Sequence, residues 1–355
     1  MPESAEPLTS AAPAAPGTAG APSAPATSAT SAARAGFALL GAVQVVLIFT
    51  LAAVAVPLPR IGAEFGTGRA GLILLTAAYG LSFAGLLLCG GRLADRYGGR
   101  RILTVGLLVF GSATALAALS PGFGALLAAR FAQGVGAALV APAAMAVLRA
   151  LFPAPAAYGR AMATWGGLSV LGATAGNLVS GVVSALAGWR WTFAVPVLVV
   201  LLALAGSRRL LPAAPGRPDR SLDLPGALLA TAGISLTSLG LVLTEAEPWS
   251  SPVVWGPLLA GPALLAAFPL VERRRADPLL PPGFASHPRR RLGLAAIALA
   301  AAGTSAVFVL LSLGLQEQRG WSALRTSAAF VPFAAALIGT GRAAGPLIGR
   351  YGPAG

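Results

Sequence analysis

The sequence predicts an all-α membrane protein with about ten transmembrane helices, and three observations support this fold class. Apolar residues make up 56% of the 355 residues and charged residues only 10%, whereas a soluble domain carries about 25% charged residues to cover its surface. Ten apolar runs follow one another along the chain, each close to the roughly 20 residues that cross the hydrocarbon of a bilayer. Arginines are concentrated in alternate loops between these runs.

The N-terminal segment differs from the rest of the chain. Residues 1–35 are Ala, Pro, Ser, Thr and Gly with almost no charge, so we expect a disordered tail. Because the bilayer core offers no water, each apolar run that follows must satisfy its own backbone polar groups, which favours a helix. We place the runs at about 36–57, 71–90, 102–120, 123–146, 163–186, 191–210, 225–244, 252–271, 293–314 and 327–348.

The placement of charge predicts the topology, because cytoplasmic loops carry an excess of Arg and Lys. With the N-terminus in the cytoplasm, 18 arginines fall inside and 5 outside, and five of the six tryptophans fall at outer boundaries, where amphipathic rings prefer to lie. We therefore expect a multi-pass protein of a bacterial plasma membrane with a cytoplasmic N-terminus. The outside arginines are Arg60, Arg69, Arg190, Arg319 and Arg325, and the one tryptophan at an inner boundary is Trp165.

Several functional classes are excluded by composition. The single cysteine, Cys89, and the single histidine, His287, provide neither a disulfide framework nor a metal site nor a Ser/His/Asp triad. We therefore expect no metal and no cofactor. The net charge of +14 would suit nucleic acid, but the charges lie between apolar runs, so we expect the lipid bilayer, and no nucleic acid, as a partner.

The first predicted cytoplasmic loop, residues 91–101, reads Gly-Arg-Leu-Ala-Asp-Arg-Tyr-Gly-Gly-Arg-Arg. Gly91 allows close helix packing and Gly98 permits a tight turn. Asp95 and Arg96 lie at a helix end, where a carboxylate can face the N-terminus of a neighbouring helix. The alternative is an ordinary basic loop. The pattern resembles the signature loop between helices 2 and 3 of the major facilitator superfamily, which implies a role for Asp95 and Arg96 in the transport cycle.

The fourth run contains Arg130, about a third of the way into a membrane helix. An arginine at such depth is expensive, by about 2.5–3.5 kcal/mol or more at the centre, so it faces a polar interior or snorkels to the headgroups. Gln133 and Gly134 lie on its face of the helix, one turn on. This segment resembles the helix-4 motif of the superfamily, which implies that Arg130 and Gln133 take part in proton coupling.

The fifth run contains Gly172, Gly176 and Gly181, small residues that let helices approach closely. It resembles the helix-5 motif of the antiporter branch, in which Gly-Pro is usual, but Asn177 stands in place of the proline. Without that proline the helix need not kink. Asn177 is therefore a candidate for the cavity, and packing alone is the alternative.

The first run resembles the start of the multidrug branch but departs from it. Thr50 and Ala55 stand where that branch usually carries an Asp and an Asn, and no acidic residue lies deep in any run. Carboxylate-based proton binding therefore has no candidate there. We take Gln44 and Thr50 as cavity candidates in this segment.

Late in the chain, residues 345–352 echo the first loop, with Gly349 in place of its Asp, as expected of two related halves. The resemblance covers about residues 36–355 and is to the fourteen-helix drug–proton antiporter branch. It implies a complete N-terminal half at 36–211, a linker with two inserted helices at 212–272, and at 273–355 only the first two helices of the C-terminal half, as in a C-terminally truncated transporter.

The resemblance implies a secondary active transporter, not an enzyme, that exports a small amphipathic molecule or drug in exchange for protons. The alternative is a transport-inactive fragment that acts only with a partner chain. A polytopic membrane enzyme is the third hypothesis. Such enzymes cluster Asp, Glu or His near one interface, whereas Asp95 is the only acidic residue in the first two predicted cytoplasmic loops.

Overall fold

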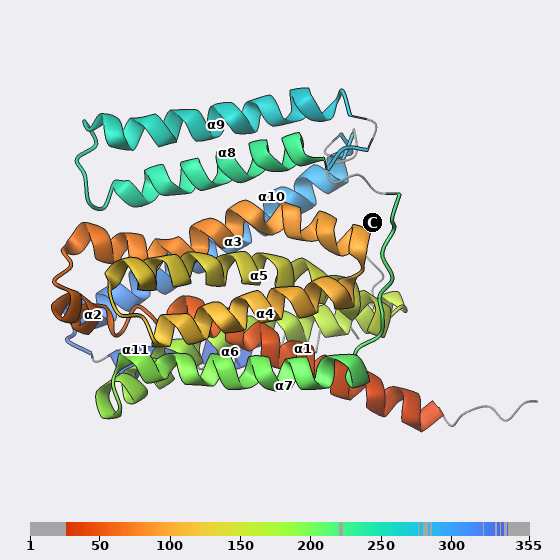
Figure 1. Cartoon of the computed structure of the whole chain (residues 1–355), viewed down its shortest axis with the longest axis horizontal. Helices are drawn as coiled ribbons and strands as arrows, with labels where there is room; N and C mark the ends of the chain where they lie inside the picture. Colours follow the sequence, from red (N-terminus) through yellow and green to blue (C-terminus); the bar gives the residue numbers. More distant parts are fainter. Residues whose placement is uncertain are drawn as a thin grey trace, which may run out of the picture.

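A computed structural model shows a helical protein (Figure 1). It describes residues 26–219, 223–275, 277–279, 283–284, 286–321, 323–330, 332–333, 335–336 and 339. The helices are α1 (Ala26–Ala52), α2 (Leu58–Phe65), α3 (Arg69–Tyr97), α4 (Gly99–Ala118), α5 (Phe123–Leu151), α6 (Pro155–Leu186), α7 (Ala194–Leu210), α8 (Leu224–Leu243), α9 (Pro252–Glu272), α10 (Pro288–Leu313) and α11 (Ala323–Ala329). A 3₁₀ turn, η1 (Trp189–Phe193), precedes α7, and a π-helical turn, η2 (Gly314–Gln318), follows α10.

The predicted all-α membrane fold is confirmed. Among the described residues, eight helices are long and apolar enough to cross a bilayer, namely α1 and α3 to α9. They correspond to the first eight predicted runs, and α10 corresponds to the ninth. Most of the tenth run, 327–348, and the repeat at 345–352 lie outside the described residues.

The start of α1 lies within the segment that we expected to be a disordered tail, residues 1–35. Residues 1–25 lie outside the described residues, and α1 begins at Ala26. Alanine has the highest helix propensity, and extending an existing helix needs no new nucleus. The Ala-rich residues 26–35 therefore continue the membrane helix towards its N-terminus.

Six helices form the central bundle. α1 packs on α6 and α7, α4 packs on α5 and α7, and α3 packs on α5. α8 packs on the outside of α3, and α9 packs on α8, so these two helices form an added layer (Figure 1). The short α11 contacts α6.

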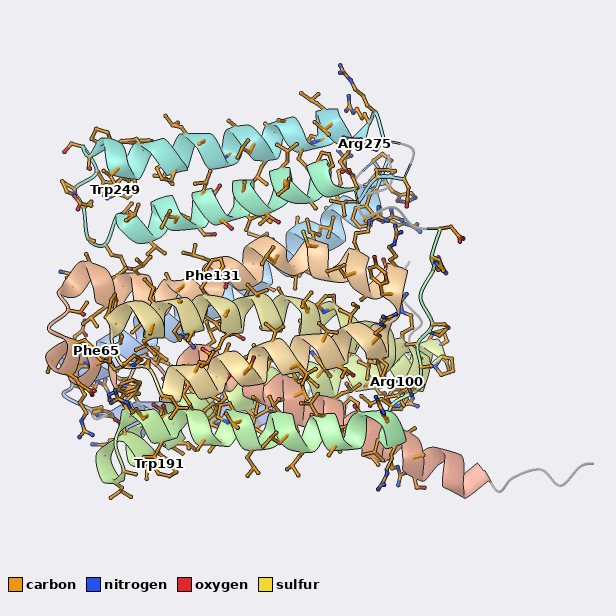
Figure 2. The ribbon with its side chains drawn as sticks, in the orientation of Figure 1. Phe65, Arg100, Phe131, Trp191, Trp249 and Arg275 are labelled. Atoms are coloured by element: carbon orange, nitrogen blue, oxygen red, sulfur yellow. The ribbon has the colours of Figure 1, made fainter. Side chains whose placement is uncertain are left out.

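The two ends of the bundle differ in composition. Figure 2 shows Trp191, Trp249 and Phe65 at one end, which we call the tryptophan end, and Arg100 and Arg275 at the other, which we call the arginine end. Such a separation of aromatic and basic residues along one axis is typical of helices that cross a membrane.

Candidate functional site

Arg130 lies in the centre of the bundle and is completely buried. Its Nη1 donates hydrogen bonds to the backbone oxygen of Thr50 on α1 and to Oε1 of Gln133 on α5, both at 3.0 Å. Its guanidinium also lies over the ring of Tyr79 on α3, 5.0 Å from the ring centroid. Arg130 therefore contacts α1 and α3 from its position on α5.

The polar contacts continue from Arg130 into α4. Gln133, also completely buried, donates through Nε2 to Oγ1 of Thr114 at 3.0 Å. Thr114 in turn donates to the backbone oxygen of Phe110 at 2.6 Å. Tyr79 donates its hydroxyl hydrogen to the backbone oxygen of Leu47 at 3.0 Å. The resulting network joins α1, α3, α4 and α5 through buried side chains.

The charge of Arg130 is only partly satisfied. Within the part of the chain that the structure describes, its Nε and Nη2 atoms have no hydrogen-bond acceptor and no carboxylate forms an ion pair with it. A buried charge without a counter-ion is expensive. Any change that brings an acceptor or a counter-ion to these two N–H-bearing atoms would therefore lower the free energy of the protein.

An apolar cavity of about 420 Å³ lies beside this network. Its volume is within the range of small-molecule sites, about 300–1,000 Å³. Gln44 contributes an amide, which donates to Oγ of Ser169 at 2.9 Å. The lining comes from α1, α3, α5 and α6 and consists of Gln44, Leu47, Ile48, Leu51, Tyr79, Phe83, Leu87, Ala141, Pro142, Met145 and Trp165.

The hairpin between α3 and α4, at the arginine end, is held by the linker that follows α7. Gly98 turns the chain with a φ of +96°, a conformation that favours glycine. The next amide, that of Gly99, donates to the backbone oxygen of Ala214 at 2.9 Å, and the amide of Arg217 donates to the backbone oxygen of Asp95 at 2.7 Å. Arg100 adds a side-chain bond to the backbone oxygen of Leu211 at 3.1 Å. We call linker residues 211–217 the strap.

A second cavity, of about 540 Å³, opens where the strap crosses the hairpin. Asp95, Arg149 and Arg217 contribute its charged side chains, and all three are exposed. Tyr158 lies under Arg149, with the guanidinium 5.3 Å from its ring centroid. We call this space the vestibule. It adjoins the apolar cavity, because Pro142 and Met145 line both.

A bundle of this kind, with a strapped hairpin and a cavity beside a buried arginine, can be compared with known proteins. The family model of the Major Facilitator Superfamily matches residues 38–355. The chain belongs to the major facilitator superfamily.

Three curated relatives of this superfamily chain come from actinomycetes. This chain is 39% identical over 90% of its length to the puromycin resistance protein pur8 of Streptomyces alboniger, and the alignment covers 63% of that protein. It is 36% identical over 86% of its length to the cephamycin export protein CmcT of Amycolatopsis lactamdurans, covering 63% of it. It is 35% identical over 84% of its length to the lincomycin resistance protein of Streptomyces lincolnensis, covering 62% of it. The chain thus spans somewhat less than two thirds of these relatives.

Among solved structures, a crystal structure of the peptide transporter POT aligns with a TM-score of 0.52 at 18% identity. The alignment covers 68% of this chain and 53% of that one, and at this identity it supports the fold alone. The superfamily is one of transporters, so the expectation that the chain is not an enzyme is confirmed.

The motif glycines of this major facilitator chain fall into two groups. A methyl group on Gly134 would overlap the backbone oxygen of Tyr79, and one on Gly172 or Gly176 would lie 2.6 or 2.7 Å from the backbone oxygen of Val45 or Phe49, respectively. These three glycines let α5 touch α3 and α6 touch α1. A methyl group on Gly91 or Gly181 would make only ordinary contacts, at 3.9 and 3.7 Å.

The remaining predicted site residues lie as follows. Gln44 lines the apolar cavity. Thr50 is buried, donates its hydroxyl hydrogen to the backbone oxygen of Val46 at 2.8 Å, and offers Arg130 its backbone oxygen. Asn177 donates to the backbone oxygen of Ala173 within α6 at 3.3 Å. Arg96 lies near the ring of the adjacent Tyr97, 5.6 Å from its centroid.

Sequence reasoning overlooked three residues of the site. Tyr79 and Thr114 belong to the buried network, and Trp165 lines the cavity. Trp165 carried a signal, because it was the one tryptophan away from the predicted outer boundaries. Tyr79 and Thr114 lie inside apolar runs, where one hydroxyl among many small residues has no distinctive spacing.

A separate polar cluster closes the tryptophan end. Trp189 and Arg190 of η1 donate to the two carboxylate oxygens of Glu64 on α2, at 2.7 and 2.6 Å. Arg190 also donates to the backbone oxygen of Ser120 at 3.2 Å. The hydrogen bond from Trp189, followed by that from Arg190, holds the pKa of Glu64 below its usual range. This cluster fastens α2 against the start of α7.

Proposed function

We propose that this chain carries the substrate site of a secondary active exporter, which moves small amphipathic molecules out of a bacterial cell in exchange for protons. The observation that carries the proposal is the apolar cavity of about 420 Å³, which shares Tyr79 with the buried Arg130 network. A mostly apolar cavity with a few polar groups suits an amphipathic small molecule. The relatives named for antibiotic resistance and export support the outward direction.

The orientation forms part of the proposal. We infer that the arginine end faces the cytoplasm, with the N-terminus on that side, because basic residues favour the inner face. The vestibule, which adjoins the cavity at Pro142 and Met145, then lies on the cytoplasmic side of it.

The domain arrangement is proposed on the same basis. Residues 36–211 form the N-terminal half, and α8 and α9 are the pair inserted between the halves in the fourteen-helix branch. α10 then begins the second half. In alternating access, the two halves rock about a central site. The α8–α9 pair lies outside α3, so it leaves the cavity lining free for the second half.

Arg130 and Gln133 are proposed as the coupling residues. Arg130 holds a buried positive charge, and its Nε and Nη2 atoms have no acceptor among the described residues. Arg130 also contacts both α1 and α3. A conformation that supplies an acceptor to those atoms is stabilised relative to one that does not. Arg130 therefore biases the equilibrium between the inward and outward states.

The hairpin is proposed to act at the same conformational step. The strap fixes the backbone of Asp95 and Gly99, which leaves the side chains of Asp95 and Arg96 as the groups that can change partners between states.

Proteoliposomes that contain the purified chain and trapped pyranine test the proposal. We expect at least one of puromycin, lincomycin and a cephamycin to move protons across the membrane under an imposed pH gradient, while liposomes without protein show no such flux. Arg130→Gln should abolish the flux. The matched control Arg208→Gln, an exposed arginine at the end of α7, should preserve it.

Movement of a radiolabelled compound without proton flux would contradict the coupling and leave export intact. If folded protein shows neither proton flux nor movement of the compound, transport by this chain is rejected. That result would favour the alternative of an inactive membrane fragment that needs a partner chain.

A further inference from the structure

The membrane interior of the six-helix bundle carries charge of one sign. None of the runs 36–57, 71–90, 102–120, 123–146, 163–186 and 191–210 contains an Asp or Glu. Arg130 is the ionised side chain buried at their centre, and in the described residues no carboxylate pairs with it. The electrostatic potential of this region is therefore positive.

Tyr79 lies between Arg130 and the apolar cavity, so the cavity is close to this positive charge. Its ring lines the cavity and packs under the guanidinium of Arg130. At an effective dielectric constant of about 20, a unit charge about 10 Å from Arg130, at the Tyr79 end of the cavity, would change affinity on the order of tenfold. Arg149 lies 19 residues further along α5, about 28 Å away, so this effect does not extend to a charge in the vestibule. The sign of that effect disfavours a cation in the cavity and favours an anion.

The vestibule adds positive charge on the approach to the cavity. Arg149 and Arg217 outnumber the single carboxylate of Asp95 there. Pro142 and Met145 line both spaces, so the two spaces are neighbours, and the inference places one end of a ligand of moderate length in each. Such a molecule would meet guanidinium groups at one end and aromatic rings at the other.

We infer that the site selects amphipathic organic acids over amphipathic amines. The apolar body lies in the cavity against Phe83, Leu87 and Trp165, and the carboxylate lies in the vestibule near Arg149 and Arg217. Guanidinium groups bind carboxylates through paired N–H donors. This inference rests on the proposed function, because it assigns the substrate class of the same cavity.

Three matched probes test the inference: 6-(2-naphthyl)hexanoate, its methyl ester and 6-(2-naphthyl)hexylamine. They share one aromatic body and one chain length and carry a negative, a neutral and a positive head group. Equilibrium binding to the full chain in phosphatidylcholine nanodiscs should give the tightest affinity for the carboxylate, about tenfold above the ester, and the weakest for the amine. An amine that binds as tightly as the carboxylate would overturn the inference.

Variants locate the carboxylate. Arg149→Gln combined with Arg217→Gln should reduce carboxylate affinity about tenfold and leave ester affinity unchanged. Both side chains are exposed, and the strap keeps the backbone amide of residue 217. The control pair Arg208→Gln with Arg209→Gln removes equal charge at the same end, outside both cavities, and should have no effect. Equal losses in the two double variants would overturn the assignment to the vestibule.

The remaining outcomes separate this inference from the proposed function. If the ester binds and Trp165→Ala weakens it, but the carboxylate shows no advantage, the inference fails and the cavity stands. If none of the probes binds to folded protein, both fail. Nanodiscs with phosphatidylglycerol test a lipid source of the anion. Loss of the carboxylate advantage there would identify the vestibule as a lipid headgroup site and overturn the inference of a soluble substrate.

Discussion

Arg217 donates its backbone amide hydrogen to the backbone oxygen of Asp95 over 2.7 Å, and this bond fastens the strap to the hairpin between α3 and α4. Three residues further along the chain, Gly98 adopts a positive φ of +96° beside Ala214. The hairpin and the linker beyond α7 are thus one structural unit at the arginine end, although about 115 residues separate them in the sequence.

Removal of the Arg217 amide should loosen this unit. Arg217→Pro eliminates the donor to Asp95, and the loss of one hydrogen bond costs about 1 kcal/mol. We expect the amide of Gly99, which is bonded to Ala214, to exchange with deuterium roughly fivefold faster. Arg217→Gln keeps the amide and should exchange as the unaltered protein does. Equal exchange rates in both variants would show that the strap does not hold the hairpin.

Replacement of Arg130 should separate stability from function. Arg130→Met removes a buried charge with which no carboxylate of the described residues pairs, a change that is often neutral or stabilising, but it leaves Oε1 of Gln133 unpaired. We expect the thermal unfolding midpoint to change by only a few degrees while proton-coupled flux is lost. A large drop in the unfolding midpoint would assign Arg130 a structural role instead.

Gly134 should tolerate no side chain. In Gly134→Ala the added methyl group would overlap Ser82 and the backbone oxygen of Tyr79, and overpacking of this kind costs about 1–3 kcal/mol. Thermal unfolding in detergent should show the loss. Gly80→Ala on α3 is the matched control, because its added methyl group meets no atom within 4 Å. A stable Gly134→Ala protein would mean that α3 and α5 can separate at this point.

Acid should weaken the contact between α2 and η1. The pKa of Glu64 is lowered in the folded state by Trp189 and Arg190. Its contribution to stability is therefore present above the usual carboxyl pKa and is lost as the pH falls through the folded value. Because the side chain is 38% exposed, solvent screening keeps the contribution at about 1 kcal/mol or less.

The measurement is the unfolding midpoint of the protein and of Glu64→Gln between pH 7 and pH 3. The glutamine variant should be slightly less stable at pH 7, and the two proteins should converge at the acidic end. A constant difference over the whole range would exclude titration of Glu64 as the cause.

The helices could be predicted because hydropathy and chain length decide which segments cross a membrane. α3 (Arg69–Tyr97) and α5 (Phe123–Leu151) extend beyond the runs at 71–90 and 123–146, since the arginines that end an apolar run have a high helix propensity. The first residues of α1, from Ala26, were included in the predicted tail because they contain Ser and Thr. Their alanines, which favour a helix, were given too little weight. Helix ends depend on neighbours that hydropathy does not report.

Only part of the candidate site could be predicted from the sequence. Arg130 and Gln133 could be selected because a charge and an amide are rare in an apolar run. Their partners on other helices could not, because the contact of Arg130 with Thr50 uses a backbone oxygen, which every residue offers. The strap could not be predicted either. Its hydrogen bonds to Asp95 and Gly99 join backbone atoms, so they do not require particular side chains.

The lateral layer of α8 and α9 has a consequence for biosynthesis. α8 packs on the outer face of α3, and α9 packs on α8, so the six helices of the central bundle can reach their final arrangement before the ribosome has made either. When the pair leaves the translocon as one helical hairpin, a single face of a single helix has to dock. The helices then assemble in the membrane in the order of their synthesis. No contact already formed within the bundle has to open when α8 and α9 dock.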